Sequence, residues 1–393
     1  MVDTTMKYNH KKFLKSFEAI DLGSIHIQTP DGSHHNFDSH KPGPKANLKI
    51  KDWSVIDMLL EKGETGFGED YINGLWDTES VPELLTFATL NANSLEKNLF
   101  HGGFWEKIRF YFAHLRNRNS LKGSRRNIEY HYDLGNDFYR LWLDPSMTYS
   151  SAFYGDKDIP LEMAQHQKYQ RLLNKFPTPG SILEIGCGWG GFAQKAGERG
   201  HTLKGLTLSH EQLAYSKARM KKHDLNKSVQ LVLQDYRKEQ GLFDYVVSIE
   251  MFEAVGEKYW PIYFKKIRES LKMGGKALIQ TITIDPKLFK DYRKRSDFIR
   301  QYIFPGGMLP SPDVFIKLAQ RHKLVLKNRE SFGQDYVKTL YAWRDRFHKV
   351  PQEIQTLGFD DRFIRKWEFY LASCIASFAA KRTNVYQFEL EAV

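Results

Sequence analysis

The stretch Leu183-Glu-Ile-Gly-Cys-Gly-Trp-Gly-Gly191 decides the fold of most of this 393-residue chain. An apolar strand ends at Ile185, and Gly186, Gly188 and Gly190 turn the chain into a helix. Glycine adopts positive φ without penalty and lets the backbone approach a ligand closely. Because the loop follows a strand and opens a helix, it predicts a ligand site, although a tight turn with packing glycines has the same pattern.

The spacing of the glycines separates this loop from a dinucleotide-binding loop. Its pattern is G-x-G-x-G, without the third glycine position of the pyrophosphate fingerprint. Glu184 lies inside the strand just before the first glycine, where it can face an amino-acid moiety. An S-adenosylmethionine loop has this form. The usual acid at the end of the second strand is missing, so Thr207, Ser209 and Gln212 are expected to contact the ribose, and Asp235 the adenine amino group.

Apolar runs alternate with helical stretches on the C-terminal side of Pro179. Strands are predicted at residues 181–185, 201–206, 229–233, 243–248, 276–284 and 322–329, with 385–391 closing the sheet, and helices at 191–198, 209–223, 259–271, 312–322 and 361–381. Such alternation implies right-handed βαβ units and a parallel sheet. Residues 128–393 are therefore predicted to form a doubly wound, Rossmann-like α/β domain.

Residues 1–112 are predicted to form a smaller α+β domain. Short β-like runs at 24–29 and 47–51 mix there with helix-like runs at 55–61 and 81–92. The chain then becomes basic and aromatic from Phe104 to Arg126, and a basic linker is expected at 113–127.

The composition is globular, with 41% hydrophobic and 27% charged residues, which excludes a disordered or fibrous protein. Lys and Arg number 58 against 47 Asp and Glu, and the net charge of +11 favours nucleic acid, an anionic membrane surface or a phosphorylated substrate. Two distant cysteines, Cys187 and Cys374, exclude a disulfide framework and indicate a reducing compartment. The N-terminus carries no secretory pattern, and the most apolar run, at 369–380, is too short to span a bilayer.

Eight ordered motifs in residues 128–393 closely resemble the cyclopropane-fatty-acyl-phospholipid synthases. They are Tyr130-His-Tyr-Asp-Leu-Gly-Asn-Asp137, Met147-Thr-Tyr-Ser-Ser-Ala-Phe153, the glycine loop, Leu206-Thr-Leu-Ser209 with Gln212, Leu233-Gln-Asp-Tyr-Arg237, Met251-Phe-Glu-Ala-Val-Gly256, Tyr302-Ile-Phe-Pro-Gly-Gly307 and Phe332-Gly-Gln-Asp-Tyr336. Residues 1–110 are similar only in general character. The resemblance implies a class I S-adenosylmethionine-dependent methyltransferase fold and transfer of a methylene group to the cis double bond of a phospholipid acyl chain.

By this resemblance, the cofactor would be held by a set of residues from five segments. They are Tyr149, Ser150, Glu184, Gly186, Gly188, Gly190, Thr207, Leu208, Ser209, Gln212, Gln234 and Asp235. Tyr149 and Ser150 would close over the cofactor.

The resemblance also implies a bound bicarbonate beside the reacting carbon. Its matching positions are Ser151, Glu253, Gln280, the backbone of Ile282, and Tyr336. Ser151 replaces a cysteine and Gln280 a histidine, and Ala254 stands where a histidine is more familiar. Neither a serine hydroxyl nor a glutamine amide titrates near neutrality, so bicarbonate oriented by Glu253 and Tyr336 is the expected base.

Three features have two interpretations each. Cys374 matches a cysteine sometimes regarded as catalytic, but a thiol in an apolar helix is also ordinary packing. Aromatic residues in 130–154 and 336–343 are candidates to stabilise a cation in a dry pocket, or belong to the core. The basic segments 104–126 and 287–300 either dock on anionic head groups or form a solvated surface.

Other functions compatible with these patterns are a small-molecule amine N-methyltransferase and a non-cyclising lipid C-methyltransferase. The N-terminal domain, Tyr336 and the apolar richness favour the lipid. No RNA-binding module or zinc spacing appears, so neither nucleic acid nor a metal is expected. The expected partner is an anionic phospholipid bilayer, met by a peripheral cytoplasmic protein on the inner face of the membrane. The sequence leaves a homodimer open.

Overall fold

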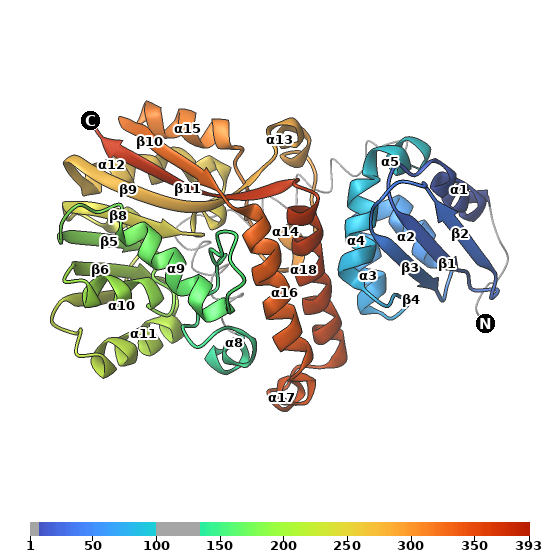
Figure 1. The fold of residues 1–393 in the computed structure, drawn as a ribbon, viewed down its shortest axis with the longest axis horizontal. Coiled ribbons are helices and arrows are strands. Elements are labelled where there is room, and N and C mark those ends of the chain that lie inside the picture. Colours follow the sequence, from blue (N-terminus) through green and yellow to red (C-terminus); the bar gives the residue numbers. More distant parts are fainter. Residues whose placement is uncertain (1–7, 100–133) are drawn as a thin grey trace. The chain divides into compact units, whose positions relative to one another are not determined.

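The computed structural model describes residues 8–99 and 134–393, which fall into two units (Figure 1). The N-terminal unit contains residues 8–99 together with 294–303 and 351–382, and the second unit contains residues 134–293, 304–350 and 383–393. The predicted linker at 113–127 and the basic segment at 104–126 lie outside the described residues. None of the helices in the described ranges is both long and apolar enough to cross a bilayer.

The N-terminal unit is built on a four-stranded sheet with the order β2-β1-β3-β4. Strand β1 pairs antiparallel with β2 and parallel with β3, and β3 pairs antiparallel with β4. The elements are α1 (Tyr8–Ser16), η1 (Phe17–Ala19), β1 (Ser24–Gln28), β2 (His34–Asp38), β3 (Lys45–Ile50), α2 (Ser54–Lys62), α3 (Glu64–Ile72), β4 (Trp76–Asp77), α4 (Val81–Leu90), α5 (Ala92–Leu99), α14 (Phe298–Tyr302), α17 (Pro351–Thr356) and α18 (Asp361–Ala379). This sheet with its helices confirms the α+β domain.

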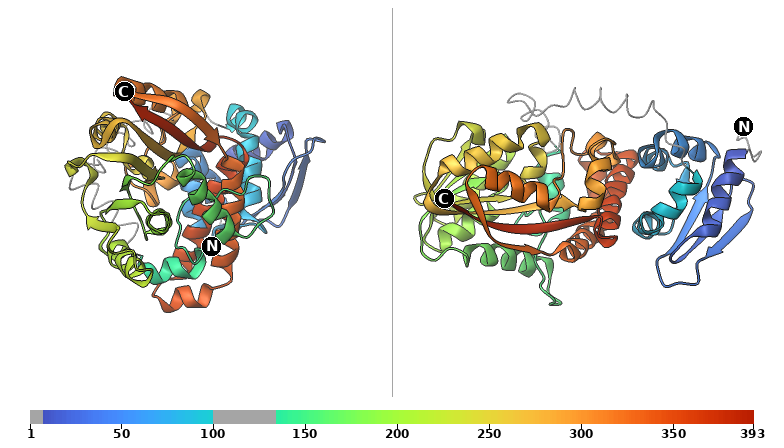
Figure 2. Two further views of the ribbon diagram at one scale, coloured as in Figure 1. Left: turned by 60° about the vertical axis from the view of Figure 1, so that its left-hand side comes forward. Right: turned by 90° about the horizontal axis from the view of Figure 1, so that it is seen from above.

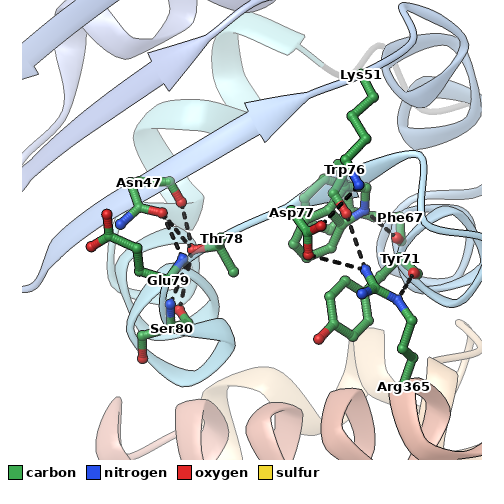
Figure 3. Close-up of polar contacts among 10 residues, drawn as sticks. All are labelled: Asn47, Lys51, Phe67, Tyr71, Trp76, Asp77, Thr78, Glu79, Ser80 and Arg365. Atoms are coloured by element: carbon green, nitrogen blue, oxygen red, sulfur yellow. Dashed lines mark hydrogen bonds and ion pairs between the residues drawn. The ribbon is translucent and has the colours of Figure 1, made fainter. Parts of the chain in front are cut away.

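Helix α18 belongs to this unit by its packing, whereas the sequence placed residues 361–381 in the catalytic domain. It lies against α3 and α4. Its Arg365 donates from Nε to the Tyr71 carbonyl (2.6 Å) and from Nη2 to the Trp76 carbonyl (3.2 Å) and Asp77 (3.3 Å), as Figure 3 shows. The guanidinium also covers the Tyr71 ring at 3.9 Å. One side chain thus connects the helix to the end of α3 and to β4.

The second unit contains a seven-stranded sheet with the order β10-β11-β9-β8-β5-β6-β7. Strands β7, β6, β5, β8 and β9 run parallel, and β11 pairs antiparallel with both β9 and β10. The elements are α8 (Asn136–Trp142), α9 (Leu161–Leu173), β5 (Ser181–Ile185), α10 (Gly191–Glu198), β6 (Thr202–Thr207), α11 (His210–Lys222), β7 (Val229–Leu233), η2 (Tyr236–Lys238), β8 (Phe243–Ile249), η3 (Phe252–Ala254), η4 (Glu257–Tyr259), α12 (Trp260–Ser270), β9 (Leu271–Ile284), α13 (Pro286–Tyr292), α15 (Pro312–Arg321), β10 (Leu324–Ser331), α16 (Gly333–His348) and β11 (Thr383–Ala392). The doubly wound α/β prediction is confirmed.

Side chains at alternating positions of the central strands pack into two separate cores, one on each face of this sheet. On β5, Leu183 packs with the core under α12 and α15, whereas Ile182 packs with the core under α9 and α10. On β8, Val246 and Val247 divide in the same way. Figure 2 shows helices on both faces. Strands buried on both sides explain the continuous apolar runs in the sequence.

Candidate active site

A cavity lies at the carboxyl ends of β5, β6, β7 and β8, the edge where ligands bind in open α/β sheets. Ten of the twelve residues predicted to hold the cofactor line it: Tyr149, Ser150, Glu184, Gly186, Gly188, Thr207, Leu208, Gln212, Gln234 and Asp235. Gly190 and Ser209 are not among the described residues that line it. Trp189, Arg237 and Met251 also line it, and the sequence did not single them out.

The glycine loop shapes one wall of this cavity. Gly188 has a φ of +50°, and no described atom lies within 4 Å of the position that an added Cβ would take. Gly190 has a φ of +81° and precedes α10, and there a Cβ would meet the Ser216 side chain at 3.0 Å. Gly188 therefore leaves the backbone open to a ligand, whereas Gly190 serves the turn and the packing on α11.

Glu184 brings a buried carboxyl group to the wall of the cavity. Its side chain is 3% exposed, and Oε2 has no hydrogen-bond partner within the described part of the chain. Burial raises the pKa of this carboxyl to about 8. A buried carboxyl oxygen that lacks a donor is suited to receive an ammonium group from a ligand.

The loop after β6 is held by its own hydrogen bonds. The Thr207 hydroxyl donates to Gln212 Oε1 (3.0 Å), and the Gln212 backbone N–H donates to Ser209 Oγ (3.2 Å). Ser209 is thus the N-cap of α11, which explains why it does not line the cavity. Beyond β7, Asp235 accepts from the side chain of Arg237 at 2.8 and 2.5 Å.

Glu250, which the sequence reasoning missed, forms the centre of a second cluster. Its Oε1 accepts hydrogen bonds from the Ser151 backbone N–H (2.8 Å) and from Gln280 Nε2 (2.7 Å), and its Oε2 accepts from the Tyr336 hydroxyl (2.7 Å). Gln387 donates to Gln280 Oε1 (2.9 Å), which turns the amide NH2 of Gln280 toward Glu250. Glu250 also lines the cavity, so it joins this cluster to the cofactor residues.

Glu253 has different partners. Its Oε1 accepts from the Thr281 hydroxyl (2.9 Å) and from the Ile282 backbone N–H, while its Oε2 has no partner among the described residues. Burial, and then the neighbouring Glu250 charge, raise the pKa of Glu253 to about 8. The residues predicted to share one bicarbonate are therefore divided between two carboxyl groups of the chain itself.

Lys168 on α9 is a second titratable group that the sequence reasoning missed. Its Nζ donates to Ser150 Oγ at 2.6 Å, and its side chain is fully buried. Burial lowers the pKa of Lys168 to about 7, while the negative charges of Glu250 and Asp144 oppose that shift. Cys374, by contrast, lies on α18 in the N-terminal unit.

Aromatic rings from the two predicted segments gather beside the cavity. Tyr149 lies 5.5 Å from Trp142 and 5.3 Å from Trp343, measured between ring centroids, and Trp343 lies 6.0 Å from Tyr336. Trp142 and Trp343 are fully buried. These rings form an apolar, water-poor wall next to the Glu250 cluster.

One signal for Glu250 was available in the sequence. It follows β8 directly, at the sheet edge where Glu184, Thr207 and Asp235 also gather, and it precedes the Met251–Gly256 motif. The structure adds a feature that the sequence does not show: the backbone φ of Glu250 is +49°, which is unusual for a residue other than glycine. No comparable signal marked Lys168, whose helix had not been predicted.

Comparisons with known proteins find relatives similar in sequence and in fold. The family model described as mycolic acid cyclopropane synthetase matches residues 119–388. The chain is 37% identical to the tuberculostearic acid methyltransferase UfaA1 of Mycobacterium tuberculosis, over 84% of this chain and 79% of that protein. It is 34% identical to the cyclopropane-fatty-acyl-phospholipid synthase of Escherichia coli, over 87% of each. The crystal structure of the mycolic acid cyclopropane synthase CmaA1, in complex with SAH and CTAB, is 29% identical and superposes with a TM-score of 0.64, covering 68% of this chain and 98% of that one.

Proposed function

The chain belongs to the mycolic acid cyclopropane synthetase family of S-adenosylmethionine-dependent lipid methyltransferases, and from this we propose that it converts the cis double bond of an unsaturated phospholipid acyl chain into a cyclopropane ring. The observation that carries the proposal is the Glu250 cluster, because it sets a group able to accept a proton against the wall of the cofactor cavity. Ring closure requires that the transferred methyl group lose one proton, so a base beside the methyl group is essential.

The cavity residues fit S-adenosylmethionine. The unpartnered Oε2 of Glu184 suits its ammonium group, and the open backbone at Gly188 allows close approach of its amino-acid part. The Thr207 and Gln212 side chains are placed for a ribose, and Gln234 would lie toward the adenine. Bound there, S-adenosylmethionine supplies an electrophilic methyl group.

The residues of the chain perform the remaining tasks of alignment and water exclusion. An alkene is a weak nucleophile, so holding it in line with the methyl group supplies much of the rate enhancement. The buried rings of Trp142 and Trp343, with the half-buried ring of Tyr149, exclude water, which would otherwise capture a cationic acyl chain, and their faces stabilise positive charge.

Bicarbonate does not fit the site as the residues are arranged. Ser151 N–H, Gln280 and Tyr336 donate to Glu250, and Ile282 N–H donates to Glu253. A bicarbonate ion would have to displace one of these carboxyl groups from its donors. No step of the proposed reaction therefore passes through bicarbonate.

The second candidate function is methylation of the acyl chain without ring closure. The 37% identity to a protein named tuberculostearic acid methyltransferase favours it. In this reaction the proton is lost to leave a methylene branch, and a saturated methyl branch would additionally need a reductant.

We also propose that the substrate is met at the surface of an anionic bilayer. Lys287 and Lys290 on α13 are exposed, and the segment 287–300 carries six Lys and Arg residues against the two acidic residues Asp291 and Asp297. Each basic side chain near an anionic surface contributes about 1 kcal/mol. Binding to anionic vesicles that weakens as salt rises, with little binding to neutral vesicles, would support this partner.

The experiment that tests the function is incubation of the protein with S-adenosylmethionine and vesicles of a monounsaturated phospholipid, followed by mass spectrometry and NMR of the acyl chains. We expect a gain of one CH2 unit with loss of the double bond and appearance of ring protons. The same mass gain with a retained double bond would favour the non-cyclising reaction. Methylation of added amines with unchanged lipid would contradict both lipid reactions.

A further inference from the structure

We propose that Glu250 is the catalytic base of this protein, with its carboxylate occupying the place that the family resemblance assigned to bicarbonate. This inference rests on the proposed function, because it names the group that removes the proton from the transferred methyl. It also predicts that the protein works without added bicarbonate.

The position of Glu250 carries the first part of the argument. It follows the carboxyl end of β8 and lines the cofactor cavity, whereas Glu253, the base-orienting residue expected from the sequence, is not among the described residues of that wall. A base must lie within hydrogen-bond reach of the proton it takes. Of these two carboxyl groups, Glu250 is the one at the surface where the methyl group would arrive.

The hydrogen-bond donors carry the second part. Donors from three residues that the resemblance assigned to bicarbonate converge on the two oxygens of Glu250 at 2.7–2.8 Å: the Ser151 backbone N–H, the Gln280 amide and the Tyr336 hydroxyl. The Ser151 hydroxyl, which was expected to face bicarbonate, donates instead to the Ala152 carbonyl (3.0 Å). A carboxylate and a bicarbonate present the same planar O–C–O group. The same donors can therefore hold either one, and here they hold the side chain.

The backbone carries the third part. Glu250 has a φ of +49°, in the left-handed region where a residue other than glycine is strained. Such strain persists where the surrounding structure requires the side chain. A glycine would adopt this backbone without strain, so the strain accompanies the presence of a side chain at this position.

The local charges keep this carboxylate available. Burial raises the pKa of Glu250, and the Lys168 charge and the hydrogen bonds from Tyr336 and Gln280 lower it. Lys168 acts on Glu250 through its charge, and it donates to Ser150, the residue before the donor Ser151, so it is a positioning residue.

The proposed step balances without an external oxidant or reductant. The π pair of the double bond forms the new C–C bond with the methyl carbon as the S–C pair returns to sulfur, and the neighbouring acyl carbon becomes cationic. Glu250 then takes one proton from the new methyl group, and the released C–H pair closes the ring on the cationic carbon. The products are a cyclopropane, S-adenosylhomocysteine and a protonated carboxyl group that returns its proton to water.

The test compares Glu250→Gly with Glu250→Gln. Both remove the base, so turnover should fall by about 10²–10⁴-fold in each. Only the glycine variant leaves an open place with three donors, and its conformation suits φ +49°. We therefore expect formate or bicarbonate to restore part of the turnover of Glu250→Gly and none of that of Glu250→Gln. Wild-type turnover should be the same in buffer scrubbed of bicarbonate.

Calorimetry without S-adenosylmethionine gives a readout that does not depend on activity. Formate should bind to Glu250→Gly, but not to wild type or to Glu250→Gln, and the thermal midpoint of Glu250→Gly should match or exceed that of wild type. Wild-type turnover that needs bicarbonate, or Glu250→Gln turnover within threefold of wild type, would overturn the proposal. A wild-type protein that leaves lipid unchanged would instead contradict the proposed function, and formate binding to Glu250→Gly would still decide whether this place accepts an O–C–O group.

Discussion

Glu184, which is buried, and Glu250, which is partly buried, lie at the carboxyl ends of neighbouring parallel strands, β5 and β8, and both line the same cavity. Oε2 of Glu184 has no partner in the described part of the chain, whereas both oxygens of Glu250 accept hydrogen bonds. The difference separates two uses of a buried acid. A carboxyl group short of donors is ready for a cationic ligand, and one surrounded by donors is fixed in place before the ligand arrives.

The two environments also differ in what opposes burial. For Glu184, burial raises the pKa to about 8, and no lowering contribution offsets it. For Glu250, burial raises the pKa, but Lys168, Tyr336 and Gln280 lower it. Glu184 therefore gains most when a ligand brings positive charge, while Glu250 already has compensating neighbours.

The largest effect is expected from closing the cavity on the Glu184 side with Gly188→Val. A side chain there would enter the open space next to the backbone and would also strain a residue at φ +50°, so S-adenosylmethionine binding should fall by more than about 100-fold. The matched control is Gly200→Val, at φ +82° with similarly open surroundings but away from the cavity wall. Calorimetry on both folded variants measures the effect, and equal affinities would remove the glycine loop from the cofactor site.

A smaller effect is expected from Glu184→Gln, which should weaken S-adenosylmethionine binding by about 10–100-fold, because a hydrogen bond to a charged group contributes about 1.5–3 kcal/mol. Turnover at saturating S-adenosylmethionine should stay within a few fold of wild type.

Tyr336→Phe is the matched control for this change, because it removes one donor from Glu250 and none from Glu184. It should lower turnover by about tenfold and leave S-adenosylmethionine binding unchanged. If Glu184→Gln lowered turnover and Tyr336→Phe lowered binding, the division of roles between the two acids would be wrong.

The fold was largely predictable because its strands are buried on both faces. Runs such as 181–185 and 229–233 are apolar, short and separated by helical periodicity, and most of the predicted strands begin and end within two residues of the observed ones. The exception is β9, which begins at Leu271, five residues before its predicted start. The strand at 34–38 was missed because its His, Asn and Asp residues are exposed or half-buried and show no apolar alternation. The placement of α18 was not predictable, because it depends on contacts of Arg365 with residues almost 300 positions earlier.

The cofactor side of the site was also more accessible to sequence reasoning than the base. Glu184 and the glycine loop are adjacent in sequence, so one motif displays both. The donors to Glu250 come from the loop at Ser151, from β9 and from α16, and only the fold brings them together. The resemblance assigned Gln280 and Tyr336 to bicarbonate, whereas in the structure both side chains donate to Glu250.

The smallest effect, a change in the pH dependence of stability, tests the Glu184 side without any ligand. Because the pKa of Glu184 is raised to about 8 in the folded chain and is 4.5 as the ordinary value, the folded state binds the proton more tightly. Its contribution to stability is fully present below pH 4.5 and is lost as the pH rises through 8. Glu184→Gln cannot ionise, so its urea-unfolding free energy should match that of wild type near pH 5 and exceed it near pH 8.

Two other acids keep part of the pH dependence of stability in the variant: Glu253, with a pKa raised to about 8, and Glu64, with a pKa raised to about 7. The control is Glu198→Gln, because the pKa of Glu198 is lowered by Lys195 and Gln194 and its loss should not reduce the slope between pH 5 and 8. Saturating S-adenosylhomocysteine, which carries the same ammonium group, should stabilise wild type more than Glu184→Gln. An unchanged slope in Glu184→Gln would mean that Glu184 is not the ligand-seeking member of the pair.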